Sequence, residues 1–197
     1  MDIEKIVNFA EKNKGLIKTS ELKKLGADYR GIQKLIEKEI LEKIRNGTYK
    51  LKDYDLTEEE LVCSLFPNGV LCMESALFIH GYLESKPFQW DIAVNKDVSK
   101  SLFKIDYPFV KPYYMEEDQL MVGAVKYKMF SGEMFVYDKE RTIVDCIKYE
   151  NKTNRDIYTK AVRSYIDDPD KNQDSLYSYA ATRRIYKKVK DVLGIWI

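Results

Sequence analysis

The sequence predicts an α+β protein with a small helical N-terminal module and a C-terminal domain that combines several helices with a small, mainly antiparallel sheet. Residues 1–52 contain short amphipathic helical patterns, followed by an Asn-Gly pair between two strand-like runs. Residues 88–137 contain four runs rich in aromatic and β-branched residues, which favour strands. Helical patterns return over residues 138–149, 153–166 and 174–193. Strands and helices are thus largely segregated along the chain, as in α+β proteins.

The composition is that of a globular chain of 197 residues, 45% hydrophobic and 33% charged. The apolar runs are too short for a transmembrane helix, and the N-terminus lacks the basic-then-apolar plan of a signal peptide, so we expect a cytoplasmic protein. Three scattered cysteines and one histidine argue against a disulfide framework or a zinc site. We therefore expect neither a metal nor a cofactor.

Charge is distributed unevenly between the two parts of the chain. Residues 1–52 hold 13 Lys and Arg against 8 Asp and Glu, a balance of +5. The remainder holds 20 against 24, a balance of −4. A basic module on a mildly acidic body favours a polyanionic partner for the module.

Three short helices are expected in the N-terminal module. Asp2 can cap the first, in which apolar residues recur at helical spacing. The second covers residues 21–25 and ends at Gly26, which suits a left-handed exit. Asp28 can cap the third, which extends to about Lys38. The hairpin around the Asn-Gly pair follows directly.

The third helix has an apolar arc and a polar arc of similar width at 100° per residue. The apolar arc comprises Ile32, Leu35 and Ile36. The polar arc contains Arg30, Gln33 and Lys34. In the major groove an Arg side chain suits guanine, Gln suits adenine, and Lys suits guanine or a phosphate. The other interpretation is a surface helix whose polar residues are only solvated.

The hairpin alternates bulky residues with cations around Asn46-Gly47, a favoured two-residue turn. Three helices followed by a basic hairpin are typical of a winged helix-turn-helix, here residues 1–52, with double-stranded DNA as the partner. The predicted DNA-binding residues are Thr19, Ser20, Tyr29, Arg30, Gln33, Lys34, Arg45, Asn46, Thr48 and Lys50.

A linker leads to the second domain, residues 57–197, where Thr57 and Glu60 form a capping box at the start of a helix. The last helical segment carries five cations within eight residues. These are Arg183, Arg184, Lys187, Lys188 and Lys190. They form either a second basic surface, for flanking DNA or an acidic partner, or a solvated helix face.

Catalytic motifs are not found in the sequence. It contains no phosphate-binding glycine loop, no H-E-x-x-H and no C-x-x-C. His80 ends an apolar segment, where a hydrogen-bonded structural histidine is expected. Glu74 and Asp91 are candidate paired carboxylates, but the sequence does not bring them together. We therefore expect a protein that is not an enzyme.

A resemblance to AbiEi-family antitoxins, transcriptional regulators of AbiE abortive-infection systems for antiviral defence, is carried by three runs. The N-terminal module resembles the family's winged-helix start over GLIKTSELKKLGADYRGIQKLIEKEILEKIRNGTYKL. The family's small-residue helix after the linker is similar to VLCMESALFIHGY, and its E-R-T-I-x-D helix start is similar to DKERTIVDCI. The resemblance spans most of the chain.

The resemblance implies a repressor that binds inverted repeats in its own promoter through the winged helix. It further implies a C-terminal antitoxin domain that antagonises a nucleotidyltransferase-like toxin in a type IV toxin–antitoxin system, in which the two proteins need not form a stable complex. Two alternatives stay open. One is a ligand-responsive winged-helix repressor with a small-molecule sensor as its C-terminal domain. The other is an enzyme with a carboxylate site in the strand-rich middle of the chain.

Overall fold

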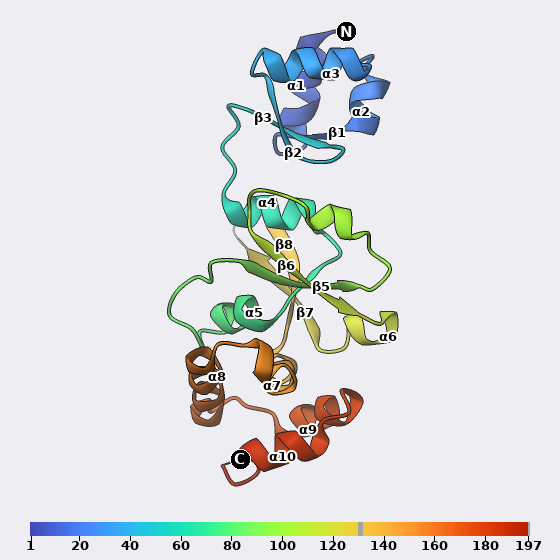
Figure 1. Ribbon diagram of the computed structural model, residues 1–197. Helices are drawn as coiled ribbons and strands as arrows, with labels where there is room; N and C mark the ends of the chain where they lie inside the picture. Colours follow the sequence, from blue (N-terminus) through green and yellow to red (C-terminus); the bar gives the residue numbers. More distant parts are fainter. Residues whose placement is uncertain (130–131, 197) are drawn as a thin grey trace. The chain divides into compact units, whose positions relative to one another are not determined.

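The computed structural model describes residues 1–129 and 132–196, and these form an α+β protein, as predicted (Figure 1). Ten α-helices accompany a three-stranded antiparallel sheet and a five-stranded mixed sheet in the described residues. The chain divides into two compact units. Unit 1 comprises Met1–Leu61 and Ser99–Pro108, and unit 2 comprises Val62–Val98 and Phe109–Ile197. The sequence places the boundary between domains at residues 52–57. In the structure the first boundary falls at Leu61, inside a helix, and unit 1 also includes a second segment of the chain.

Unit 1 contains the three predicted helices and the predicted hairpin. Its elements are α1 (Ile3–Lys12), β1 (Leu16–Lys18), α2 (Thr19–Lys24), α3 (Tyr29–Glu37), β2 (Leu41–Arg45) and β3 (Thr48–Leu51). The caps at Asp2 and Asp28 are confirmed, since their carboxylates accept the backbone N–H of Lys5 and Gly31. Strand β1 was not predicted, and it makes β3 the central strand of the sheet.

The core of unit 1 is formed where the apolar faces of the helices meet the sheet. Its buried residues include Ile6, Leu22, Ile32, Leu35 and Leu41. Gly15, between α1 and β1, has a φ of +71° and lies so close to the Tyr54 ring that a Cβ atom would come within 2.4 Å of it. A glycine is therefore required here for both backbone conformation and space.

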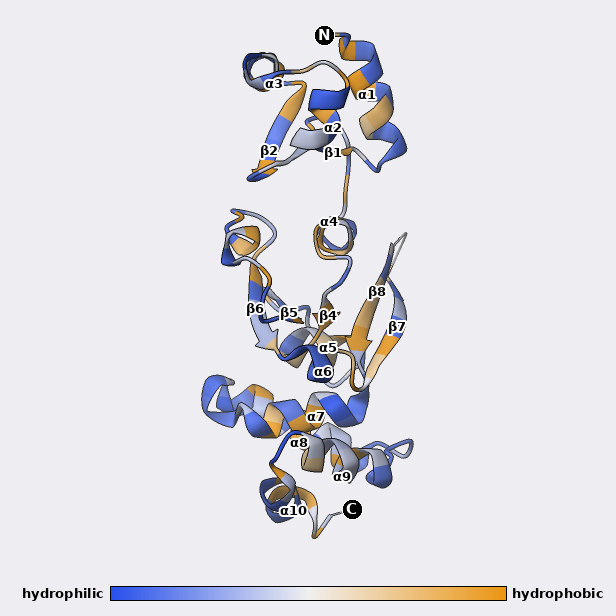
Figure 2. Ribbon diagram, turned by 90° about the vertical axis from the view of Figure 1, so that its right-hand side faces the viewer, coloured by the Kyte–Doolittle hydropathy of each residue, from blue (hydrophilic) through white to orange (hydrophobic). Residues whose placement is uncertain are grey.

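Unit 2 combines the five-stranded sheet with helices. Its strands are β4 (Val70–Leu71), β5 (Trp90–Asn95), β6 (Val110–Met115), β7 (Ala124–Met129) and β8 (Gly132–Tyr137). Its helices are α5 (Met73–Ile79), α6 (Glu117–Leu120), α7 (Lys139–Lys148), α8 (Arg155–Asp167), α9 (Gln173–Thr182) and α10 (Tyr186–Leu193), while α4 (Glu58–Leu65) contains the division between the units. Figure 2 shows β8 as hydrophobic along most of its length, in keeping with its interior position in the sheet. The predicted turn at Ser131-Gly132 lies partly outside the described residues.

The sheet of unit 2 is mixed, so the prediction of a mainly antiparallel sheet was wrong. In the order β6-β5-β4-β8-β7, parallel pairs alternate with antiparallel pairs. Strands β5 and β6 are parallel because the long connection of residues 96–109 returns the chain to the same end of the sheet. Strand β4 is only two residues long, and it pairs with β5 on one side and with β8 on the other.

The last predicted helix is broken into α9 and α10. The chain turns at Arg184, whose φ is +59°, and the N–H of Ile185 donates to the carbonyl of Ala180. This turn lets the preceding residue, Arg183, reach into the interior of unit 2. Its Nε donates to Oδ1 of Asp145 at 2.8 Å.

Helix α7 is the central element of unit 2, packing against α5, α8, α9, α10 and β8 (Figure 1). Every residue from Glu140 to Ile147 is buried. Two of them form a buried ion pair, because Nε of Arg141 donates to Oδ2 of Asp145 at 3.0 Å. Asp145 thus accepts from two guanidinium groups, one on each carboxylate oxygen. Burial lowers the pKa of Arg183, but attraction to Asp145 more than offsets this and raises it.

The Arg141 guanidinium also connects α7 to helix α6 and to the loop between α6 and β7. Its Nη1 donates to the carbonyls of Gln119 and Val122 at 3.3 and 2.7 Å, and its Cζ lies 4.3 Å from the centroid of the Tyr137 ring. The DKERTIVDCI run therefore specifies a buried ionic network rather than a surface.

Replacing Asp145 with Asn should destabilise unit 2 by about 3–5 kcal/mol, because two buried arginines lose their counter-ion. Urea unfolding followed by the fluorescence of the buried Trp90 measures the effect. The matched control is Asp191→Asn, at an exposed position of α10. Equal midpoints for the two variants would contradict the assigned role of the network.

Candidate nucleic-acid interface

The exposed face of α3 contains the residues predicted to contact DNA. Ile32 and Leu35 are buried in the core of unit 1, which directs the opposite side of the helix outward. On that side Arg30 and Lys34 are exposed, and Gln33 is half-buried. Tyr29 is 74% exposed at the start of the helix. Neither Arg30 nor Lys34 forms an ion pair with any residue that the structure describes. We define these four polar and aromatic side chains as the α3 face.

The hairpin turn lies beside the start of α2. Gly47 has a φ of +78°, as the turn requires, and its carbonyl accepts the backbone N–H of Thr19 at 3.0 Å. Asn46 and Ser20 are exposed, whereas Thr19 is half-buried. Thr48 is buried, and its Oγ1 accepts from Nε of Arg45 at 3.5 Å.

Arg45 and Lys50, both predicted to contact DNA, have partners within unit 1. Nη1 of Arg45 donates to the carbonyl of Leu102 at 3.3 Å, and burial lowers the pKa of Arg45. Nζ of Lys50 lies 3.0 Å from Glu42 and 3.0 Å from the carbonyl of Tyr54. The physical reason is that acceptors near the hairpin, on the neighbouring strand and on loops of unit 1, satisfy these cations.

Lys43 is the hairpin cation that the structure leaves exposed. It belongs to the alternating pattern of the sequence, but the pattern alone does not distinguish it from Arg45 and Lys50.

The basic run near the C-terminus is split by the break between α9 and α10. Arg183 is buried against Asp145, so it does not belong to an exposed surface, contrary to prediction. Lys188 is half-buried and pairs with Glu150 at 2.8 Å. Arg184, Lys187 and Lys190 are exposed. The remaining basic surface consists of these last three residues.

Glu74 and Asp91, which the sequence could not place, lie together in unit 2. Asp91 is 1% exposed on β5, and its Oδ2 accepts the backbone N–H of Glu74 at 3.2 Å. Burial raises the pKa of Asp91 to about 7, while Lys111 on the neighbouring strand lowers it and the Glu74 carboxylate raises it further. Nε2 of Gln89 lies 3.4 Å from Oδ1 of Asp91 and also favours the charged form.

His80 and the cysteines take the structural roles expected of them. Nε2 of His80 lies 2.7 Å from the carbonyl of Tyr137. Cys63, Cys72 and Cys146 are buried. Among residues 1–129 and 132–196, no group of three or more His, Cys, Asp or Glu is arranged to hold a metal ion. None of the helices described there has the length and apolar content needed to span a membrane.

The sequence matches no protein-family model and no curated protein. The α3 face places two exposed cations, Arg30 and Lys34, on one side of a helix whose Ile32 and Leu35 are buried.

Replacing Asp91 with Asn should flatten the pH dependence of the stability of unit 2. A carboxyl whose pKa rises from 3.8 to about 7 on folding holds a proton in the folded state that the unfolded state has lost. Stability therefore falls as pH rises through this window, by on the order of 2–4 kcal/mol. Unfolding free energies at pH 4 and pH 8 measure the slope, with Asp191→Asn as control. An unchanged slope in Asp91→Asn would contradict the assignment.

Proposed function

We propose that unit 1 is a winged helix-turn-helix DNA-binding domain and that the chain is an autorepressor and antitoxin of an AbiE-like type IV system. In this proposal α2 and α3 form the helix-turn-helix, α3 enters the major groove, and β2–β3 is the wing. The observation that carries the proposal is the α3 face, on which two exposed cations and an amide lie together opposite the buried Ile32 and Leu35.

The order of the elements in unit 1 supports this reading. A helix-turn-helix needs a short turn between two helices that share one core, and Leu22 of α2 and Leu35 of α3 are both buried in the core of unit 1. Asn46 and Lys43 are the hairpin residues available for the DNA backbone, because Arg45 and Lys50 are held within unit 1. Phosphate contacts of this kind position a domain on DNA without reading its sequence.

The antitoxin role is supported by the resemblance alone. The DKERTIVDCI run lies in the buried helix α7, so it supports a shared fold for unit 2 and does not mark a surface for the toxin. The ligand-responsive repressor stays a second candidate, because unit 2 contains a groove of about 620 Å³, within the range of small-molecule sites.

Replacing Arg30 or Gln33 with Ala should weaken binding to the chain's own promoter by about 1–3 kcal/mol and relax its sequence preference. Fluorescence anisotropy with promoter and scrambled duplexes measures both effects on the full chain. Lys34→Gln should weaken both duplexes alike and reduce the salt slope by about 1, whereas Lys12→Gln on α1 is the charge-matched control. An unchanged ratio between the duplexes in Arg30→Ala and Gln33→Ala would show that α3 does not read DNA.

A double variant, Arg30→Ala with Gln33→Ala, should lose promoter repression and keep antitoxin activity. The reason is that neither side chain contributes to the core of either unit. Reporter expression measures repression, and growth of cells that express a nucleotidyltransferase-like toxin of the kind that the proposal implies measures rescue. Loss of rescue by a variant that is folded and present at the normal level would contradict the separation of the two activities.

A further inference from the structure

Apolar side chains are exposed around α10, at the end of unit 2 that lies away from the five-stranded sheet (Figures 1 and 2). Ile195 is 84% exposed, Trp196 is 64% exposed and Tyr186 is 47% exposed. A single exposed apolar side chain is ordinary on a protein surface, whereas several that lie near one another mark a surface for binding.

Three exposed cations lie in the same region, and none of them forms an ion pair within the described part of the chain. They are Arg184, Lys187 and Lys190. Val189 and Leu193 are fully buried, which turns the opposite side of α10, with Lys187 and Lys190, outward. The stem of Lys190 lies beside Gly194, where an added Cβ atom would come within 3.2 Å of its Cγ. The cationic side of α10 therefore adjoins the residues that follow the helix.

The residues after α10 are held against the end of the helix by a turn. The backbone N–H of Trp196 donates to the carbonyl of Leu193 at 2.8 Å. At the start of the helix the ring of Tyr186 lies 5.4 Å from that of Tyr177 on α9. We define the α10 surface as the three cations together with the three exposed apolar residues, Tyr186, Ile195 and Trp196.

The α10 surface combines two properties that binding to a membrane surface requires. Trp and Tyr side chains suit the boundary between lipid headgroups and hydrocarbon, and an Ile side chain gains free energy when it enters the hydrocarbon. Lys and Arg are attracted to anionic lipids. The cations outnumber the one acid of α10, Asp191, so the surface has a positive balance. DNA would offer phosphates to the cations but no hydrocarbon to Ile195.

We propose that the α10 surface binds the surface of a membrane that contains anionic lipids. Ile195 and Trp196 enter the boundary between headgroups and hydrocarbon, while the cations contact lipid phosphates. The helix itself does not insert, because its apolar side is buried in unit 2. A short apolar anchor combined with a few cations gives weak and reversible binding. The proposal uses no residue of the α3 face, so it does not depend on DNA binding by unit 1.

Co-sedimentation of the full chain with vesicles tests the proposal. We expect binding to vesicles of equal parts phosphatidylglycerol and phosphatidylcholine, no binding to phosphatidylcholine alone, and a loss of binding as salt is added. Lys187→Gln should weaken binding by about 5-fold, because one cation is lost. Ile195→Ser should weaken it by roughly 10-fold, because less apolar surface leaves water.

Tryptophan fluorescence tests where the chain meets the lipid. The sequence has two tryptophans, and Trp90 is only 1% exposed, so a change on adding vesicles reports on Trp196. We expect its emission to move to shorter wavelength with the anionic vesicles. Trp196→Phe should remove this shift and keep most of the co-sedimentation, since Phe is also apolar. An unchanged emission spectrum in a protein that co-sediments would contradict insertion of Trp196.

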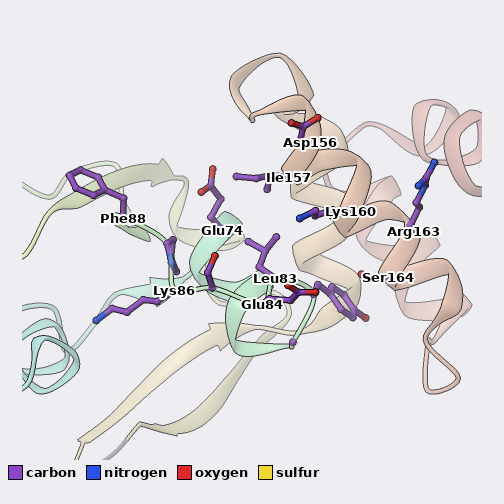
Figure 3. Close-up of a pocket in the computed structure, with 14 residues that line it drawn as sticks. Glu74, Leu83, Glu84, Lys86, Phe88, Asp156, Ile157, Lys160, Arg163 and Ser164 are labelled. Carbon is purple, nitrogen blue, oxygen red and sulfur yellow. The ribbon is translucent and has the colours of Figure 1, made fainter.

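Two control variants come from the groove between α8 and the loop of residues 81–88 (Figure 3). Phe88→Ala and Lys160→Gln remove an exposed aromatic ring and an exposed cation from unit 2, outside the α10 surface. Both should bind vesicles like the wild type. Because all the substituted side chains are exposed, each variant should unfold at the wild-type temperature, which thermal unfolding checks. No binding to the anionic vesicles, or equal losses in the control variants, would overturn the proposal.

Two other occupants of the α10 surface give different results. If the wild type does not bind vesicles and Ile195→Ser converts a dimer to a monomer in sedimentation velocity, the surface joins two copies of the chain. If the wild type does not bind vesicles and Lys187→Gln weakens binding to duplex DNA while Ile195→Ser does not, the cations contact DNA. Either result would overturn the proposal.

Discussion

The carboxylate of Asp145 is the constraint on which unit 2 depends. It is fully buried and accepts one hydrogen bond on each oxygen from the guanidinium groups of Arg141 and Arg183. A buried charge is costly unless it is paired and hydrogen-bonded, so the three side chains must come together for unit 2 to close. Arg141 comes from the same helix, whereas Arg183 comes from the C-terminal end of α9, directly before the turn at Arg184. The pairing with Asp145 thus joins the end of α9 to α7.

The partner of Arg183 could not be predicted from the sequence, whereas several local features could. Elements set by local chemistry were predicted: the caps at Asp2 and Asp28, the capping box at Thr57 and the turn at Asn46-Gly47. The basic run after residue 182 was interpreted as one exposed helix face, because a periodic pattern does not reveal which cation finds a buried partner. Arg183 and Arg184 are adjacent and chemically identical, yet one is buried and the other exposed.

Short strands were the other source of error. Strands β1 and β4 have three and two residues, too few to show an alternating pattern, yet each changes the topology around it. Strand β1 makes β3 the central strand of the first sheet. Strand β4 pairs with β5 and β8 in opposite senses, which makes the second sheet mixed. The α3 face was predictable because a nine-residue amphipathic helix shows its two sides in the sequence itself.

The structure also changes the boundary of the module that the sequence predicts to bind DNA. Composition places its end near residue 52, because the basic pattern stops there. The structure adds Ser99–Pro108, a segment that lies between β5 and β6 in sequence, and its Leu102 carbonyl accepts from Arg45 of the hairpin. A fragment that ends at residue 52 would leave this half-buried guanidinium without that acceptor, and a buried donor without a partner costs about 1–3 kcal/mol. The hairpin is therefore completed by residues that the sequence assigns to the other domain, and unit 1 is discontinuous in the chain.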